Sequence, residues 1–166
     1  MSSDDQPPHA AKPTLLFRAL PSPNPLSAAD RRALRAFAEQ LTTEVAAGHA
    51  FLCLVTDDRE LQRLNRTFLQ HDYPTDVLSF PLASPNGGLG EIAISIERAA
   101  AQAAEFGHNL LDELRILMLH GLLHLTGLDH ERDRGRMAQA ERKWRHHFAL
   151  PEGLIARSRR TAGAKA

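Results

Sequence analysis

Three histidines stand close together in the second half of the chain, in the segment His120-Gly-Leu-Leu-His124-Leu-Thr-Gly-Leu-Asp-His130. On a helix, side chains four residues apart point to the same side, so His120 and His124 can share one metal ion as ligands. Gly127 follows, and glycine readily adopts the left-handed conformation that ends a helix. The chain can therefore turn back and bring His130 to the same ion.

This set of residues predicts a catalytic rather than a structural metal. Three neutral nitrogen ligands leave a fourth position open, as in catalytic zinc sites, where the ion activates a water molecule. We predict one Zn²⁺ per chain, although other divalent ions also suit such a site. Asp129 is placed to orient an imidazole through its N–H group. Glu113, seven residues before His120, is either another such partner or the exposed start of the helix.

A central helix must present these histidines. Residues 110–125 are apolar on most sides, which predicts a helix in the middle of the domain. Pro81 cannot donate to a β-ladder, so the strand that contains it is expected at a sheet edge or to end there. The other expected elements follow from hydrophobic spacing and capping residues, such as Ser27 with Asp30 three residues later, which resembles a capping box. Strands are expected at 14–18, 50–56, 76–82 and 90–95, and helices at 28–47, 58–68, 96–106, 110–125 and 132–148.

This order of elements predicts an α+β fold, with a small mixed sheet packed with helices in a single domain. The length of 166 residues also fits one domain. We expect residues 1–13 to be a disordered extension, residues 14–150 the metallohydrolase domain, and residues 151–166 a basic flexible tail.

The composition limits the partners and the cellular location that we expect for the protein. The 20 basic and 20 acidic residues cancel, so only local patches can attract a polyanion. A single cysteine, Cys53, excludes an internal disulfide and suits a reducing cytosol. The N-terminus lacks an apolar signal region, and no apolar stretch is long enough to span a bilayer. We therefore expect a cytoplasmic protein that does not bind membranes.

The spacing H-x-x-x-H-x-x-G-x-x-H resembles that of the metzincin proteases, which makes a metallopeptidase a rival interpretation. Those enzymes carry Glu after the first histidine as the general base. Here that position is Gly121, so the base of that mechanism is missing.

The longer string HGLLHLTGLDH resembles the signature of the YbeY family of rRNA maturation endoribonucleases. A second segment agrees, because Leu64-Asn65 followed by the stretch DYPTDVLSFP at 72–81 resembles that family's sequence before and along one strand. Gly90-Glu91-Ile92 is similar to its next strand. The resemblance covers roughly residues 14–150, in the family's order.

The resemblance implies a fold distantly like the zincins, with a zinc ion on His120, His124 and His130. It implies zinc-dependent, single-strand-specific RNA cleavage in maturation of the small-subunit rRNA 3′ end and in ribosome quality control. The implied partners are single-stranded rRNA, the small ribosomal subunit, a ribosomal protein and an assembly GTPase. Asp129 or a metal hydroxide would then serve as the base.

The chain departs from the family pattern at Phe68-Leu69, where Tyr-Arg is common. An arginine there is a natural contact for phosphate. Arg66 lies about one helical turn earlier and is a candidate catalytic substitute, or else an ordinary solvated residue. The missing arginine also keeps open a non-enzymatic assembly factor with a structural metal. Candidate cations for attracting RNA are Arg132, Arg134, Arg136 and the basic tail.

Overall fold

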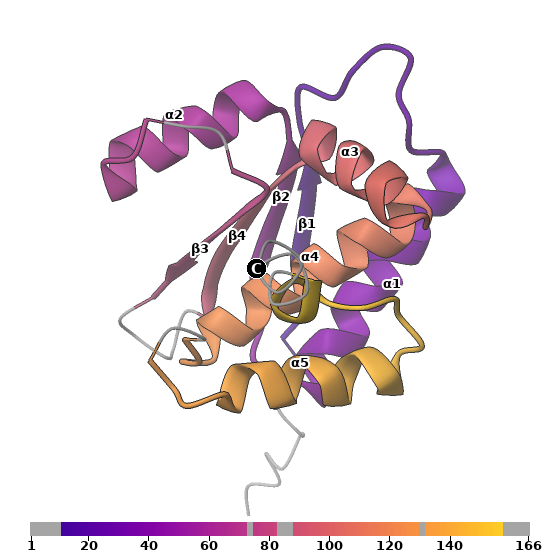
Figure 1. Cartoon of the computed structure of the whole chain (residues 1–166). Coiled ribbons are helices and arrows are strands. Elements are labelled where there is room, and N and C mark those ends of the chain that lie inside the picture. Colours follow the sequence, from indigo (N-terminus) through magenta and orange to yellow (C-terminus); the bar gives the residue numbers. More distant parts are fainter. Residues whose placement is uncertain (1–10, 73–74, 83–87, 130–131, 158–166) are drawn as a thin grey trace, which may run out of the picture.

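The computed structural model describes residues 11–72, 75–82, 88–129 and 132–157. Within these residues the chain forms nine regular elements in the predicted order (Figure 1). They are β1 (Thr14–Phe17), α1 (Ala28–Glu44), β2 (Leu52–Thr56), α2 (Asp58–Leu69), β3 (Val77–Pro81), β4 (Gly90–Ser95), α3 (Ile96–Phe106), α4 (Leu110–Leu125) and α5 (Arg136–His147).

The sheet has four strands in the order β1-β2-β4-β3. The β1–β2 and β2–β4 pairs are parallel, whereas β3 runs antiparallel to β4. This mixed sheet, packed with helices, confirms the predicted α+β class. Pro81 is the last residue of the edge strand β3, as its missing N–H group predicts.

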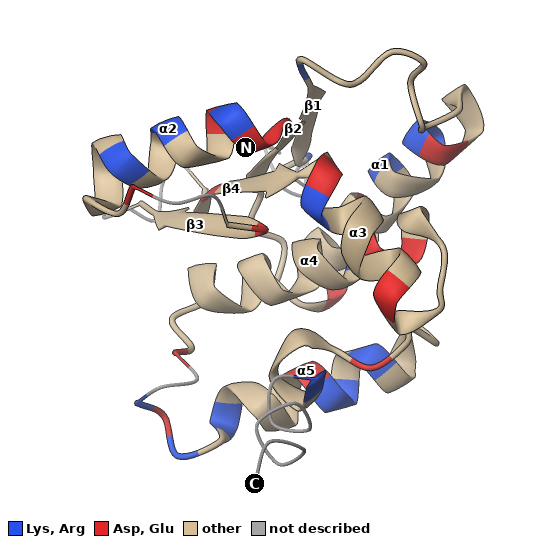
Figure 2. Ribbon diagram, turned by 45° about the horizontal axis from the view of Figure 1, so that its top comes forward, with Lys and Arg blue, Asp and Glu red and all other residues tan. Residues whose placement is uncertain are grey.

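Helix α4 lies against one face of the sheet and forms the centre of the molecule (Figure 1). Alternate residues of β2 and β4 point toward it, including Val55, Ile92 and Ile94, which are fully buried. Helices α1, α3 and α5 pack around the remaining sides of α4. Because α4 is surrounded in this way, it is apolar on almost every side, and Figure 2 shows charges only near its N-terminal end.

The other face of the sheet is covered by α2, mainly over β3 and β4. Leu61 of α2 packs there with Leu78 and Ala93 in a second, smaller cluster. Along β4 the two clusters alternate, because Ile92 and Ile94 belong to the large cluster and Ala93 between them to the small one, as the two-residue period of a β-strand requires. Helices α2 and α4 therefore lie on opposite faces of the sheet.

Local signals explain where the helices begin and end. The Ser27 hydroxyl accepts from the Asp30 N–H and the Asp30 carboxylate accepts from the Ser27 N–H, which forms the predicted capping box. Gly127 has a φ of +100° just after α4, the left-handed conformation in which the chain can turn back. Helix α5 begins at Arg136 rather than at residue 132, because the Asp133 carboxylate accepts from the Met137 N–H and organises a turn there.

The segment after α5 differs from the flexible tail expected from residue 151. Residues 154–157 form a short helical turn, and Ile155 and Arg157 are buried. Both Arg157 and the backbone of Ile155 bind carboxylates inside the domain. The expected extension at 1–13 and the end of the tail lie largely outside the described residues.

Candidate metal centre

Helix α4 brings His120 and His124 together, as their spacing predicts. Their ring centroids are 4.9 Å apart and the ring planes meet at 78°. Both rings line the same groove, whose volume is about 650 Å³. His120 is buried and His124 is partly exposed, so the pair stands at the boundary between the core and the groove.

A buried carboxylate orients the first ring. His120 Nδ1 lies 2.9 Å from Glu141 Oε2, and Glu141 is itself buried on the inner side of α5. An ionised carboxylate only accepts hydrogen bonds, so Nδ1 carries the proton in this contact. The lone pair of the neutral ring is then on Nε2. This is the arrangement in which carboxylates support metal-binding histidines.

A backbone carbonyl orients the second ring. His124 Nδ1 lies 3.0 Å from the Leu128 oxygen, just beyond the end of α4. A carbonyl oxygen cannot donate, so this contact also selects the tautomer with its proton on Nδ1. Both histidines therefore present Nε2 as the atom with a lone pair. The turn at Gly127 is what places the Leu128 carbonyl there.

The groove beside the histidines lies between the end of α4 and the edge strand β3. Its wall is largely apolar, and the lining residues that the structure describes include no lysine or arginine. Leu69, the last residue of α2, contributes to this lining. The position at which the resemblance noted in the sequence implies an arginine therefore lines the groove, and here it is a leucine. The lining residues are Leu69, Val77, Leu78, Ser79, Pro81, His120, His124, Gly127, Leu128 and Asp129.

Close packing of α4 on the sheet explains the glycine after His120. A Cβ atom at Gly121 would lie 2.8 Å from Ile92 Cγ2 and 3.2 Å from Ser79 Oγ. The Ser79 hydroxyl also donates to the Gly121 carbonyl at 3.0 Å. A glutamate at this position would collide with β3 and β4. The geometry therefore argues against the metallopeptidase interpretation, which needs a base there.

The other two residues predicted for this centre are Asp129 and His130. Asp129 lines the groove with the two histidines. His130 lies outside the described residues. Among the residues that are described, no group of three or more His, Cys, Asp or Glu side chains is arranged to hold a metal. The third predicted ligand is therefore still a prediction.

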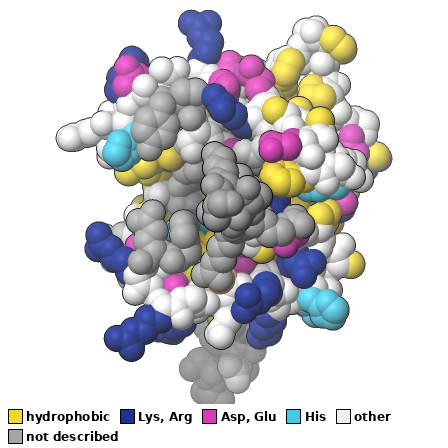
Figure 3. Space-filling view, viewed as in Figure 1, with side chains coloured by type: hydrophobic (Ala, Val, Ile, Leu, Met, Phe, Trp, Pro, Cys, Tyr) yellow, Lys and Arg dark blue, Asp and Glu magenta, His cyan; other side chains and the backbone are white. Residues whose placement is uncertain are grey.

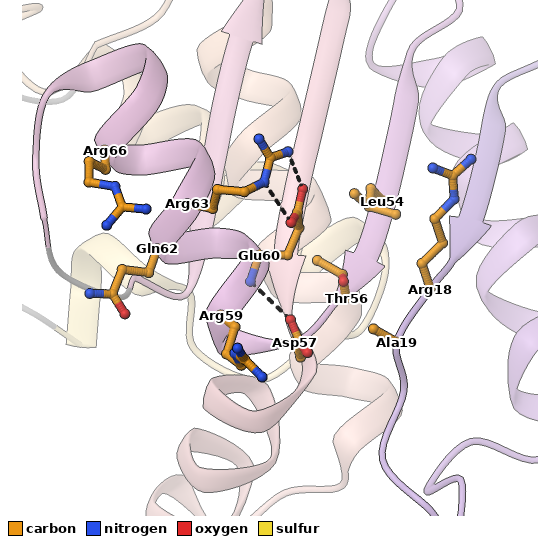
Figure 4. Close-up of a pocket in the computed structure, with 10 residues that line it drawn as sticks. All are labelled: Arg18, Ala19, Leu54, Thr56, Asp57, Arg59, Glu60, Gln62, Arg63 and Arg66. Carbon is orange, nitrogen blue, oxygen red and sulfur yellow. Dashed lines mark hydrogen bonds and ion pairs between the residues drawn. The ribbon is translucent and has the colours of Figure 1, made fainter.

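Arg66 is placed away from the histidines. It lies on α2, its guanidinium is 3.8 Å from the Asp72 carboxylate, and both groups are exposed. It lines a separate pocket with Arg18, Arg59 and Arg63 (Figure 4). In this pocket, the hydrogen bond from Arg63 holds the pKa of Glu60 below its ordinary value. The structure thus does not bring Arg66 into the groove that the histidines line.

Sequence reasoning missed Glu141 as the partner of His120. A signal was present, since Glu141 stands one helical turn after Met137 and three residues before Trp144, on the side of α5 that faces the core. An acidic residue on an apolar face needs a partner when it is buried. Glu113, by contrast, is not the exposed start of α4. It is fully buried and pairs with Arg157 and His108.

Positive charge gathers on the outer side of α5, the helix next to α4 (Figures 2 and 3). Residues 132–147 hold six basic and two acidic side chains, and one of the acidic ones is the buried Glu141. No helix in the described part of the chain has the length and apolar character needed to cross a membrane. The basic residues in this stretch are Arg132, Arg134, Arg136, Arg142, Lys143 and Arg145.

A family model and individual relatives among known proteins match most of this chain. Residues 24–149 match the family model described as Endoribonuclease YbeY. An Endoribonuclease YbeY of Solibacter usitatus is 58% identical over 127 residues, which are 76% of this chain and 85% of that relative. One from Koribacter versatilis is 52% identical, over 66% and 71% of the two chains. A solution structure from Thermotoga maritima superposes with a TM-score of 0.55 at 25% identity, over 79% and 85% of the two chains.

Proposed function

The chain belongs to the endoribonuclease YbeY family, and on that premise we propose that it cleaves single-stranded RNA at a zinc ion held by His120, His124 and His130. The observation that carries the proposal is the pair of Nδ1 contacts. Glu141 and the Leu128 carbonyl each accept a hydrogen bond from the Nδ1–H group of one histidine, which leaves Nε2 to act as a ligand.

The donor set fits zinc on chemical grounds. Neutral imidazole nitrogens are preferred zinc ligands, and the carboxylate behind His120 fixes the orientation of its ring. When bound, zinc supplies Lewis-acid chemistry that polarises a phosphodiester and activates water. The glycine at position 121 leaves no general base beside the first histidine. Asp129, which lines the groove, is the residue that we assign to accept the proton.

The groove and its surroundings suit an extended RNA strand. Edge strand β3 borders the groove and lets a substrate lie along it. Among the described residues, the lining has no lysine or arginine, so we place the charge that attracts the phosphates beside the groove. The basic outer side of α5 supplies this charge on the helix next to α4. An apolar wall with a basic border favours a single strand, whose bases are exposed.

By resemblance to its family, the proposal extends to the cellular role. The substrate is rRNA, at the 3′ end of the small-subunit RNA, and the activity also serves ribosome quality control. The partners are the small ribosomal subunit, a ribosomal protein and an assembly GTPase, and the location is the cytoplasm.

The direct test combines metal content with RNA cleavage. Elemental analysis of the purified full-length protein should find about one zinc ion per chain, as for a mononuclear site. The His124→Ala variant should lose both the ion and the cleavage of an end-labelled single-stranded RNA. The control is His146→Ala, because His146 is an exposed residue of α5 away from the groove. Cleavage of the same sequence as a duplex should be much slower.

Two results would overturn the proposal. Cleavage of an unstructured protein that disappears in His124→Ala would support the metallopeptidase. A His120→Ala variant that is destabilised, yet restores rRNA processing in cells at sufficient dose, would show that the metal is structural.

A further inference from the structure

The buried carboxylate behind His120 also binds a second segment of the chain. Glu141 Oε2 is 2.9 Å from His120 Nδ1, and Glu141 Oε1 accepts the Ile155 N–H at 3.0 Å. Glu141 is 3% exposed and Ile155 is 6% exposed. Each oxygen of the carboxylate therefore has its own donor, one from a predicted ligand and one from the C-terminal segment.

The other end of the same segment is bound to helix α4, which carries His120 and His124. Arg157 Nη1 and Nη2 bind the two oxygens of Glu113 at 3.1 and 3.0 Å, and both side chains are buried. The Arg157 guanidinium also lies over the Phe106 ring, 4.4 Å from its centroid. Glu113 is on α4, about two turns before His120. Residues 153–157 thus connect α5 to α4 through two buried carboxylates.

The fit between this segment and Glu141 is tight. A Cβ atom at Gly153 would lie 2.0 Å from Glu141 Oε1 and 2.6 Å from Glu141 Cδ. The backbone of Gly153 has no positive φ, so the constraint on this residue is steric. Only glycine lets the segment approach the carboxylate this closely. Any larger residue displaces either the segment or the carboxylate.

From these contacts we infer that the C-terminal segment 153–157 is a positioning element for the metal site. It holds Glu141 in the orientation that keeps the proton of His120 on Nδ1 and its lone pair on Nε2. His124 is oriented differently, through the Leu128 carbonyl at the end of its own helix. Disturbing the segment should therefore affect His120 and leave His124 unchanged. The part of the inference that concerns zinc binding rests on the proposed function. The part that concerns which nitrogen of His120 carries the proton does not.

The test uses Gly153→Ala in the full-length protein. The matched control is Leu154→Ala, which removes a partly buried side chain from the same segment and leaves both hydrogen bonds of Glu141 in place. Two measurements are made, namely zinc affinity by competition with a chelator and the ring ¹⁵N NMR spectrum of the metal-free protein. The spectrum reports which nitrogen of each histidine carries the proton and does not depend on activity.

We expect Gly153→Ala to weaken zinc binding about 10- to 100-fold, the usual cost of losing an outer partner of a ligand. In the metal-free spectrum, His120 should lose its preference for a proton on Nδ1, while His124 keeps its own. Leu154→Ala should leave both the affinity and the two ring spectra near those of the wild type.

Unchanged affinity and an unchanged His120 spectrum in a folded Gly153→Ala protein would overturn the inference. If this variant does not fold, Arg157→Lys loosens the other anchor while keeping its charge, and wild-type zinc affinity in that variant would overturn the inference equally. Failure of the wild-type protein to bind zinc would instead refute the proposed function. The ring spectra would then still decide whether the segment positions His120.

Discussion

The buried pair of Glu113 and Arg157 gives a strong prediction about stability. Glu113 is completely buried and Arg157 is 4% exposed, with two hydrogen bonds between them. Arg157→Met keeps much of the side-chain volume but removes the guanidinium from the carboxylate, which keeps its contact with His108. Breaking such a buried pair costs about 3–5 kcal/mol of the free energy of unfolding. In a chain of this length, this loss lowers the melting temperature by roughly 6–20 °C.

The double variant Glu113→Leu/Arg157→Met supplies the decisive comparison. It removes both the carboxylate and the guanidinium, so it should recover most of the stability that Arg157→Met loses, because no carboxylate then stays buried without its arginine. A matched control is Arg115→Met, which breaks the partly exposed pair with Asp112 near the start of α4. Surface pairs of this kind are worth about 0.2–1 kcal/mol.

The measurement is urea unfolding of the metal-free proteins, followed by circular dichroism at fixed pH. Metal-free samples are needed because a bound ion would add its own stabilisation. If Arg157→Met costs no more than Arg115→Met, residues 153–157 are not firmly docked and the reasoning from burial is wrong. If the double variant is less stable than Arg157→Met alone, the carboxylate is not the source of the loss.

Three further predictions concern the groove, the separate pocket and the core. Leu69→Arg places a guanidinium in a groove whose described lining residues include no lysine or arginine. This variant should raise the rate of RNA cleavage by about tenfold, given the strength of charge-assisted phosphate contacts. No gain would show that the RNA path avoids the end of α2. Arg66→Ala should change that rate by less than about threefold, since an exposed charge contributes little, whereas a loss as large as that in His124→Ala would place Arg66 in catalysis. Burial raises the pKa of the Cys53 thiol above its ordinary value of 9.0, so the folded state favours the neutral thiol. The contribution of this preference to the free energy of unfolding is complete below pH 9.0 and declines as the pH rises further. At pH 10 we expect a loss of about 1.4 kcal/mol that is absent from Cys53→Ala, and equal pH profiles for the two proteins would contradict it.

Much of the fold follows from local features of the sequence. The position of Pro81 predicted the edge strand, Ser27 predicted the start of α1, and the apolar character of 110–125 predicted the central helix. Each of these signals acts within a few residues, so it can be read without knowing the rest of the chain. The family membership and the enzyme class predicted from the two motifs are confirmed by the comparisons.

The sequence did not show which residues of α2 lie near the histidines, which come more than 50 residues later in the chain. Arg66 and Leu69 are three residues apart on α2, yet Leu69 lines the histidine groove and Arg66 lines another pocket. Which of them faces the groove depends on how α2 lies across the sheet, and no local pattern specifies that. The roles of Asp129 and His130 are still predictions from the motif.

The amino-acid sequence by itself determined the metal chemistry that is possible here, because helical periodicity alone places His120 and His124 on one side of α4. Only the tertiary structure decided what supports those rings. Glu141 comes 21 residues after His120, and Arg157 comes 44 residues after Glu113. Contacts over such separations arise when helices pack and exclude water, since a buried carboxylate must then find donors wherever the fold supplies them.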